Sequence, residues 1–306
     1  MDNIISQMVI LLLLVVVGCI ANKCGLMGGE FDRKLSNFVI NVSCPCLIVA
    51  SVMGDEFPDS GMILPLLGVG FATYVVLFGV SWLLPRYFVK RKEVRGMYSF
   101  MLMFANVGFI GYPVVSAIFG PKSVFYASLL NMPNTLFIFM VGTVFVLGKT
   151  GRPHFNWHLL YCPAMIASYI AITIVAIGWD TVPSVVSEPF RLLGNITVPG
   201  ALLVIGSSMA SMGKHHILGR PSIYVMAVLR LAVIPAALFF LFYLLGIDNT
   251  LNEINTVLTA MPVASYGTMF CLKYGRDETD MVQGTLITTL LSVITIPLLT
   301  LLFHYV

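Results

Sequence analysis

The chain alternates between long apolar stretches and short polar or Gly- and Pro-rich links. Ten stretches approach or exceed the roughly 20 residues that a bilayer-spanning helix needs, namely 4–21, 35–53, 62–87, 97–119, 123–147, 157–177, 190–212, 221–245, 254–274 and 281–303. Backbone groups that find no water must be satisfied within their own segment, so these stretches predict helices rather than open sheet. The pattern therefore predicts an all-α membrane protein with ten transmembrane helices.

The composition agrees with this interpretation and excludes several other classes. Hydrophobic residues make up 58% of the 306 positions and charged residues only 10%, whereas soluble domains carry roughly 25% charge. The six cysteines lack the paired spacing of a metal site or a disulfide framework. We therefore expect no metal and no cofactor. Since every Asp and Glu lies in a link or at a helix end, we also expect no intramembrane protease and no other enzyme.

The positive charges indicate the orientation. Fourteen of the 17 Lys and Arg residues lie in links that follow odd-numbered helices: Lys23, Arg33, Lys34, Arg86, Lys90, Arg91, Lys92, Arg95, Lys149, Arg152, Lys214, Arg220, Lys273 and Arg276. Because cytoplasmic links carry the excess of such residues, we expect a multi-pass protein of the plasma (inner) membrane with both termini extracytoplasmic. A basic face next to anionic membrane lipid requires no nucleic-acid partner.

A repeat relates the two halves of the chain. The segments "NVSCPCLIVASVM" and "NITVPGALLVIGSSM" align at an offset of 154 residues, which places Ser43 on Thr197. A second pair of segments aligns at an offset of 155 through Gly120 and Gly275. With five helices in each half, the second half must enter the membrane from the opposite side. The repeat is therefore inverted, as in many secondary transporters.

The fourth and ninth predicted helices each contain an interruption, in "FANVGFIGYP" (104–113) and "AMPVASYGTMF" (260–270). Gly permits close backbone approach and Pro removes a donor, so local unwinding is predicted in both, although small residues also serve tight helix packing. Inverted-repeat transporters bind substrate at such paired breaks.

These segments resemble the auxin efflux carrier family, which joins the plant PIN proteins to bacterial organic-acid carriers. The resemblance covers essentially the whole chain and rests on motifs in order: "FVINVSCP" (38–45), N-x-G-x-x-G-x-P (106–113), "ALLVIGSSMA" (201–210), "AMP" (260–262) and "KYGRD" (273–277).

The resemblance implies an architecture. It implies two five-helix repeats, 1–150 and 151–306, in which the fourth and ninth helices cross. Helices one, two, six and seven would form a scaffold that makes a homodimer, and helices three to five and eight to ten would form a transport unit. The implied function is secondary transport of a small organic anion, a carboxylate, by an elevator-like alternating access.

Departures from the plant pattern argue against auxin itself. Ala105 stands where many family members carry Pro, and Val263 and Ile48 stand where plant members carry Gln and a hydroxyl residue. The long cytoplasmic loop of many plant relatives is also absent. A bacterial-type carrier of small organic anions is the better interpretation. The alternatives are a channel-like or sensory membrane protein of the same fold, or an ion-coupled symporter of a larger amphipathic anion.

The candidate substrate-binding residues lie around the two breaks and in the neighbouring helices: Asn106, Val107, Gly108, Gly111, Pro113, Asn131, Arg230, Met261, Pro262 and Val263. The amide of Asn106 and the freed backbone at Val107, Gly108 and 261–263 are expected to bind the anion, together with half-helix N-termini. Asn131 serves either this site or an interhelical hydrogen bond. Arg230 lies about 15 Å along a helix from Arg220, deep enough for a substrate, gating or structural role.

Overall fold

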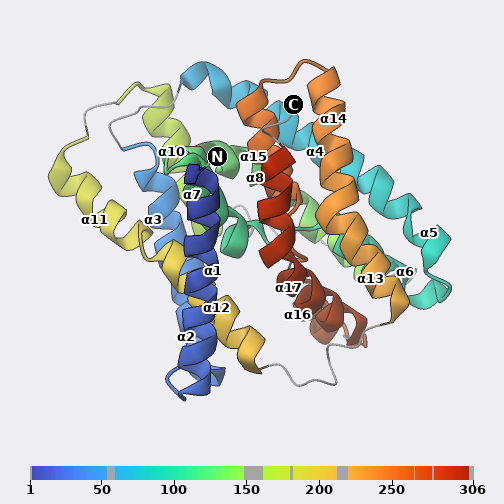
Figure 1. The fold of residues 1–306 in the computed structure, drawn as a ribbon. Helices are drawn as coiled ribbons and strands as arrows, with labels where there is room; N and C mark the ends of the chain where they lie inside the picture. Colours follow the sequence, from blue (N-terminus) through green and yellow to red (C-terminus); the bar gives the residue numbers. More distant parts are fainter. Residues whose placement is uncertain are drawn as a thin grey trace. The chain divides into compact units, whose positions relative to one another are not determined.

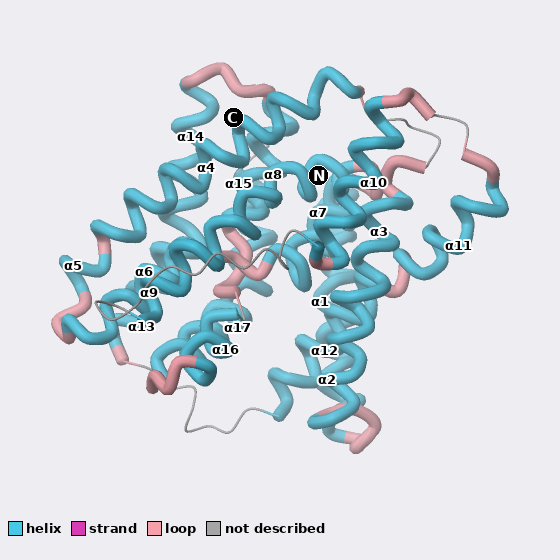
Figure 2. The backbone as a smooth tube through the Cα atoms, turned by 180° about the vertical axis from the view of Figure 1, so that it is seen from behind, coloured by secondary structure: helices cyan, strands magenta, loops and turns pink. Residues whose placement is uncertain are grey.

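A computed structural model of the chain describes residues 2–53, 59–147, 161–179, 182–211, 220–264, 266–277 and 279–302. Figure 2 shows nearly all of this part of the chain as helix, and its one extended pairing is an antiparallel bridge between Ala105 and Val263. The prediction of an all-α protein is confirmed for these residues. The expected boundary between positions 150 and 151 lies outside them.

The chain forms two compact units, each assembled from several separate segments. The first unit comprises Met1–Leu67, Gly108–Leu130 and Leu160–Met212, and the second comprises Gly68–Val107, Asn131–Leu159 and Gly213–Val306. Each unit therefore draws on both halves of the sequence.

The helices of the first unit are α1 (Asp2–Lys23), α2 (Gly29–Phe38), η1 (Val39–Ser43), α3 (Cys44–Ala50), η2 (Ser60–Met62), α7 (Tyr112–Phe119), α10 (Pro163–Ala176), α11 (Ser184–Gly194) and α12 (Thr197–Ser211). Three helices continue from one unit into the other: α4 (Ile63–Leu83), η4 (Val107–Gly111) and α8 (Ser123–Phe137).

The helices of the second unit are α5 (Pro85–Phe88), η3 (Lys92–Val94), α6 (Arg95–Met103), η5 (Ile138–Gly142), α9 (Thr143–Leu147), α13 (Pro221–Val228), η9 (Leu229–Val233), α14 (Ile234–Leu244), α15 (Asn249–Thr259), α16 (Tyr266–Lys273) and α17 (Thr279–Leu302).

Four candidate membrane spans are present among the described residues, judged by length and hydropathy: Ser60–Phe88, Ser184–Ser207, Pro221–Leu244 and Thr279–Thr300. Shorter apolar helices cover Leu13–Lys23, Val107–Phe119 and Pro163–Ala176. One reason that the structure contains fewer long spans than the sequence predicts is that the fourth and ninth predicted helices are interrupted, so each consists of two short helices.

Proline causes a recurring local distortion of the helices. Three of the wide, π-helical turns, η1, η4 and η9, are each followed at the second position by Pro45, Pro113 or Pro235. Proline offers no N–H and its ring clashes with the carbonyl four residues earlier, so the preceding turn widens. The widening is thus a local consequence of sequence, and η9 includes the buried Arg230.

In the first unit, α1, α2 and α12 run side by side (Figure 1). A Cβ atom added to Gly18 would overlap the main chain of Leu203, and one added to Gly206 would overlap that of Val15. Glycine thus lets the two backbones touch, which is the usual way that membrane helices pack without a hydrophobic driving force.

In the second unit, α6 is the most deeply buried element. Tyr98 and every residue of 100–104 are fully buried, and α15 is buried on nearly all sides from Leu251 to Thr259. These two helices end at the two breaks, so the best-packed part of the second unit surrounds the interruptions.

Candidate functional site

The two helix breaks close on each other within the second unit. Helix α6 ends at Met103 and α15 ends at Thr259, and the extended residues that follow pair in antiparallel fashion. The Asn106 N–H donates to the Pro262 carbonyl at 2.8 Å, and the Ala264 N–H donates to the Phe104 carbonyl at 3.0 Å. We call residues 104–106 and 260–264 the crossing. Each break thereby supplies partners for backbone groups that the other has freed.

The first break lies at the start of the interruption that the sequence predicts over 104–113. Residues 104–106 are extended, whereas Val107, Gly108 and Gly111 belong to the π-helical turn η4 and Pro113 lies in the first turn of α7. The second break includes Met261, Pro262 and Val263, as predicted. Of the backbone donors expected at 261–263, the Met261 N–H bonds to the Leu258 carbonyl at 3.3 Å, and Pro262 has no N–H.

Thr288 of α17, which the sequence analysis did not single out, fixes one of these donors. Its fully buried hydroxyl accepts the Val263 N–H at 3.1 Å and donates to the Gly284 carbonyl at 2.7 Å. In the sequence, the feature that could have pointed to Thr288 is a hydroxyl residue within an otherwise apolar helix. The adjacent Thr289 gives the same signal, and sequence alone does not distinguish the two.

Arg230 lies against both broken helices. Its Nη1 donates to the Leu102 carbonyl in the last turn of α6 at 2.7 Å, and its Nε donates to the Met261 carbonyl in the crossing at 3.2 Å. The carbonyl end of a helix carries partial negative charge, so the guanidinium sits where a cation is stabilised. One side chain thus connects the ends of α6 and α15.

The charge of Arg230 has no carboxylate partner among the described residues, where the ion pairs are Lys34–Glu30, Arg191–Glu188 and Arg220–Asp280. The side chain is fully buried, and its Nη2 atom has no hydrogen-bond partner in this part of the chain. Because burial of an unpaired cation is costly, such a group is a candidate for binding an anion.

A polar face of α15 adjoins the crossing in sequence. Asn252, Asn255 and Thr256 are at least 98% buried and lie on one side of the helix, at i, i+3 and i+4. Asn252 donates to the Phe239 carbonyl at 2.9 Å, and Asn255 accepts from Thr73 at 3.1 Å. The spacing of these three polar residues in the sequence could have revealed this face. The predicted ninth helix, 254–274, began too late to include Asn252.

All buried side-chain polar atoms that lack a partner among the described residues lie in the second unit: Asn134 Oδ1, Arg230 Nη2, Asn252 Oδ1, Asn255 Nδ2, Thr256 Oγ1, Thr285 Oγ1 and Thr295 Oγ1. Buried polar groups in native proteins are almost always paired, with protein, water or a ligand. The second unit is therefore the part of the described chain whose interior has spare capacity for hydrogen bonding.

The other predicted site residues are divided between the units. Asn131 belongs to the second unit, where the Tyr74 hydroxyl donates a long hydrogen bond, 3.5 Å, to its Oδ1. Gly108, Gly111 and Pro113 belong to the first unit. Asn106, half-buried, lies in the second unit with Arg230 and residues 261–263.

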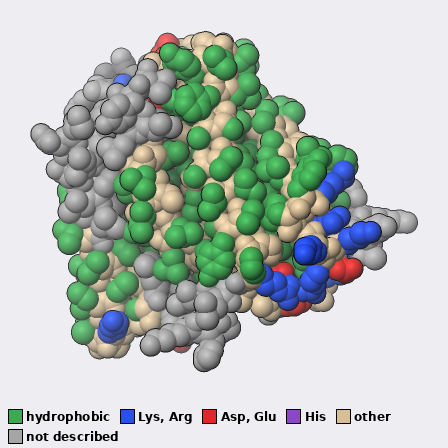
Figure 3. Space-filling model, turned by 45° about the vertical axis from the view of Figure 1, so that its right-hand side comes forward, with side chains coloured by type: hydrophobic (Ala, Val, Ile, Leu, Met, Phe, Trp, Pro, Cys, Tyr) green, Lys and Arg blue, Asp and Glu red, His purple; other side chains and the backbone are tan. Residues whose placement is uncertain are grey.

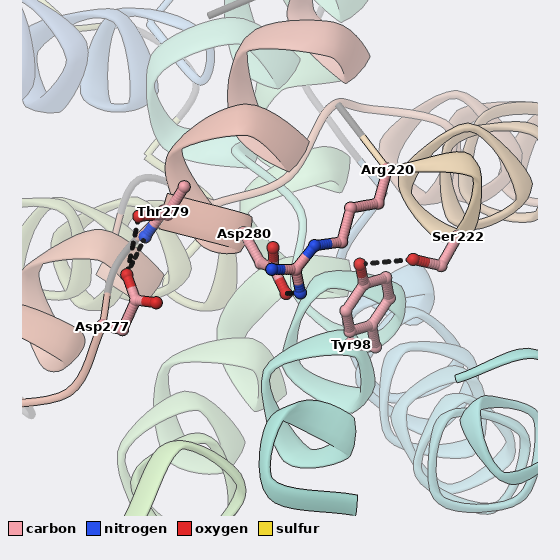
Figure 4. Close-up of polar contacts among 6 residues, drawn as sticks. All are labelled: Tyr98, Arg220, Ser222, Asp277, Thr279 and Asp280. Carbon is pink, nitrogen blue, oxygen red and sulfur yellow. Dashed lines mark hydrogen bonds and ion pairs between the residues drawn. The ribbon is translucent and has the colours of Figure 1, made fainter. Parts of the chain in front are cut away.

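Polar contacts also join the N-terminal ends of α6, α13 and α17. Arg220 pairs with the buried Asp280 at 3.4 Å, and Tyr98 and Ser222 share a hydrogen bond of 2.8 Å (Figure 4). Lys and Arg side chains gather at one end of an otherwise largely apolar face (Figure 3).

Beside this group, the backbone N–H and the hydroxyl of Thr279 both donate to Asp277, and these bonds lower the pKa of that carboxyl. Within the described residues no cluster of His, Cys, Asp and Glu could hold a metal ion.

Comparisons with known proteins give a consistent result. The model of the membrane transport protein family matches residues 3–153 and 152–300. An uncharacterized transporter of Methanocaldococcus jannaschii is 25% identical over 297 residues, covering 94% of this chain and 95% of the relative. An uncharacterized transporter of Methanothermobacter thermautotrophicus is 22% identical over 292 residues, covering 94% of each chain.

Proposed function

The chain belongs to the membrane transport protein family, the family of the auxin efflux carriers, and we propose that it is a secondary carrier of small organic carboxylate anions. The observation that carries the proposal is the crossing, where two broken helices meet inside one unit. A break in the middle of a membrane helix is tolerated only where protein or a water-filled path covers it, and transporters place substrate at such points.

The charge distribution favours an anion. Arg230 and Asp280 are the charged residues that the described part of the chain buries, and Asp280 is already paired with Arg220. A net positive charge therefore remains beside the crossing. We assign substrate binding to Arg230, to the amides of Asn106 and Asn131, and to Val107, Met261, Pro262 and Val263 of the second unit. Gly108, Gly111 and Pro113, which belong to the first unit, stay predicted site residues.

The proposed architecture is a five-plus-five inverted repeat of ten transmembrane helices. Predicted helices one, two, six and seven would be the scaffold, would make the homodimer and would contact membrane lipid. Helices three to five and eight to ten would be the transport unit that moves during alternating access. Support comes from the assembly of each unit from both sequence halves and from the approach of Ser43 to Thr197, which the repeat aligns. We place the protein in the plasma (inner) membrane, with both termini extracytoplasmic.

A carrier accounts for these features better than the alternatives do. A channel or sensor of this fold would not need a closed crossing such as the one that the Ala105–Val263 pairing makes. An enzyme would need reactive groups inside the membrane. The buried titratable groups described at the crossing do not include a carboxylate or a histidine.

Transport by purified protein in proteoliposomes tests this function. Uptake of radiolabelled lactate, pyruvate, malonate and succinate would be measured with and without the same unlabelled anion inside. A carrier gives saturable uptake that internal substrate accelerates, whereas a channel gives flux without counterflow. Absence of flux for all four anions, in vesicles where the protein is folded and inserted, would contradict the proposal.

A further inference from the structure

We infer that Nη2 of Arg230 binds the carboxylate of the transported anion, and that its single charge makes the carrier selective for monocarboxylates. This inference rests on the proposed function, which names carboxylates but not their number of charges or the atom that binds them. The number of charges and the binding atom are both inferred from the surroundings of one fully buried guanidinium, that of Arg230.

The first argument is that Arg230 uses two of its three guanidinium nitrogens to hold the side chain in place and leaves the third without a partner among the described residues. Nε and Nη1 are committed to the carbonyls of Met261 and Leu102, which hold the guanidinium plane in place. Nη2 has no partner among the described residues, although it is buried. A purely structural arginine at this depth would be expected to satisfy all its donors, since an unpaired buried donor costs stability.

The second argument is that other main-chain donors at the crossing are occupied. The N–H groups of Asn106 and Ala264 pair across the crossing, and that of Val263 pairs with Thr288. An anion that reaches this point therefore finds Nη2 as the charged donor. Guanidinium N–H groups form short, strong hydrogen bonds with carboxylates.

The third argument concerns the stability of the empty site. The carbonyl ends of α6 and α15 stabilise the guanidinium with partial negative charges, which lets Arg230 stay buried without a carboxylate. An incoming monocarboxylate then forms a neutral ion pair. A second carboxylate on the same substrate would be buried without a partner, because the other buried charge in the described residues is the paired Asp280.

A series of ligands of nearly equal size tests which number of negative charges on the ligand the wild-type protein prefers. Malonate, malonamate and malonamide carry two, one and no negative charges, and succinate, succinamate and succinamide repeat the series with one more carbon. Thermal stabilisation of purified protein by each ligand reports its affinity. The monoanion should bind about tenfold or more tightly than the dianion, and the diamide should not bind. A dianion that binds as tightly as its monoanion would overturn the inference and leave the proposed function intact.

Substitution of the arginine tests the assignment to Nη2. Arg230→Gln should weaken monoanion binding by about 10- to 150-fold, the range for a lost hydrogen bond to a charged group. Arg220→Gln, ten residues earlier at the start of the same helix and half-exposed, is the matched control and should bind normally. Arg230→Lys keeps the charge and can still donate to both carbonyls, so it reports on binding if the Gln variant does not fold.

The outcomes separate the two proposals. Wild-type affinity in Arg230→Gln would move the carboxylate away from Arg230. Where only Arg230→Lys folds, wild-type affinity in that variant would show that a guanidinium Nη2 is not what binds the carboxylate. If wild-type protein neither binds nor transports any member of the two series or the four labelled anions, the proposed function fails, and the inference fails with it.

Discussion

The hydroxyl oxygens of Ser43 and Thr197 lie 2.7 Å apart and share a buried hydrogen bond, although 154 residues separate them in the chain. The same two positions are matched when the two sequence halves are aligned. Ser43 also donates to the Leu193 carbonyl at 2.7 Å, so the proton between the hydroxyls comes from Thr197. This contact between matched positions lies inside the first unit and agrees with the proposed inverted repeat.

This bond makes a prediction about stability. Ser43→Ala should lower the free energy of unfolding by about 1 to 3 kcal/mol, because it leaves the buried Thr197 hydroxyl without its acceptor. Thr197→Val should cost less, because the Ser43 hydroxyl keeps its bond to the Leu193 carbonyl. The double variant should lose less than the sum, since both changes remove one shared bond. Denaturation of the four proteins in detergent measures this cycle. Thr173→Val, at an exposed helix position, serves as the control. Strict additivity would show that the two hydroxyls do not interact.

A second prediction concerns the support of the crossing. Thr288→Val preserves shape but removes the acceptor for the buried Val263 N–H, so it should cost about 1 to 3 kcal/mol and slow transport. Thr289→Val is the matched control, because the Thr289 hydroxyl bonds only to the Thr285 carbonyl of its own helix among the hydrogen bonds described. Unfolding and vesicle uptake would be measured for both. Equal effects of the two substitutions would mean that the Val263 contact is unimportant.

Asn106→Ala tests the amide at the first break. The backbone N–H that bonds to Pro262 is retained, so the substitution removes only the side chain. If the amide binds the anion, affinity should fall by about 10- to 150-fold with little change in folding. Asn195→Ala, at an exposed position that ends α11, is the control. Unchanged affinity and transport rate for Asn106→Ala would leave Asn106 as a packing residue.

The orientation in the membrane can be tested by reporter fusions. The excess of Lys and Arg in links after odd-numbered helices predicts that fusions after Tyr87 and Lys149 are cytoplasmic and that a fusion after Val306 is external. Paired alkaline phosphatase and fluorescent protein fusions report the two sides. A cytoplasmic C-terminus would be incompatible with ten transmembrane helices that start outside.

Substitution of Pro262 tests whether the proline itself, or the pairing with the first break, keeps α15 from continuing through the second break. Pro262→Ala restores an N–H and should favour continuation of α15 through the crossing, which would reduce transport more than stability. The Pro262 carbonyl that accepts from Asn106 is retained in the variant. Uptake and thermal stability would be compared with those of wild type. Wild-type transport would indicate that tertiary pairing alone maintains the break.

The sequence by itself determined the features that depend on neighbouring residues. Apolar length predicts membrane helices, and proline forces the preceding turn to widen, so the distorted turns before Pro45, Pro113 and Pro235 are consequences of local chemistry. The order and spacing of the five short motifs between positions 38 and 277 also sufficed for the family. Main-chain strain of this kind acts over about one helical turn and can be recognised within a short stretch of sequence.

Only the tertiary structure decided which groups the freed backbone bonds to. The pairing of Ala105 with Val263, the choice of Thr288 over Thr289 and the two carbonyls that hold Arg230 depend on segments up to 158 residues apart. A buried polar group must find some partner, but its own sequence does not specify which. The exact position of each break is therefore set where two segments of the chain can satisfy each other, which is why the first break occupies only 104–106 of the predicted 104–113.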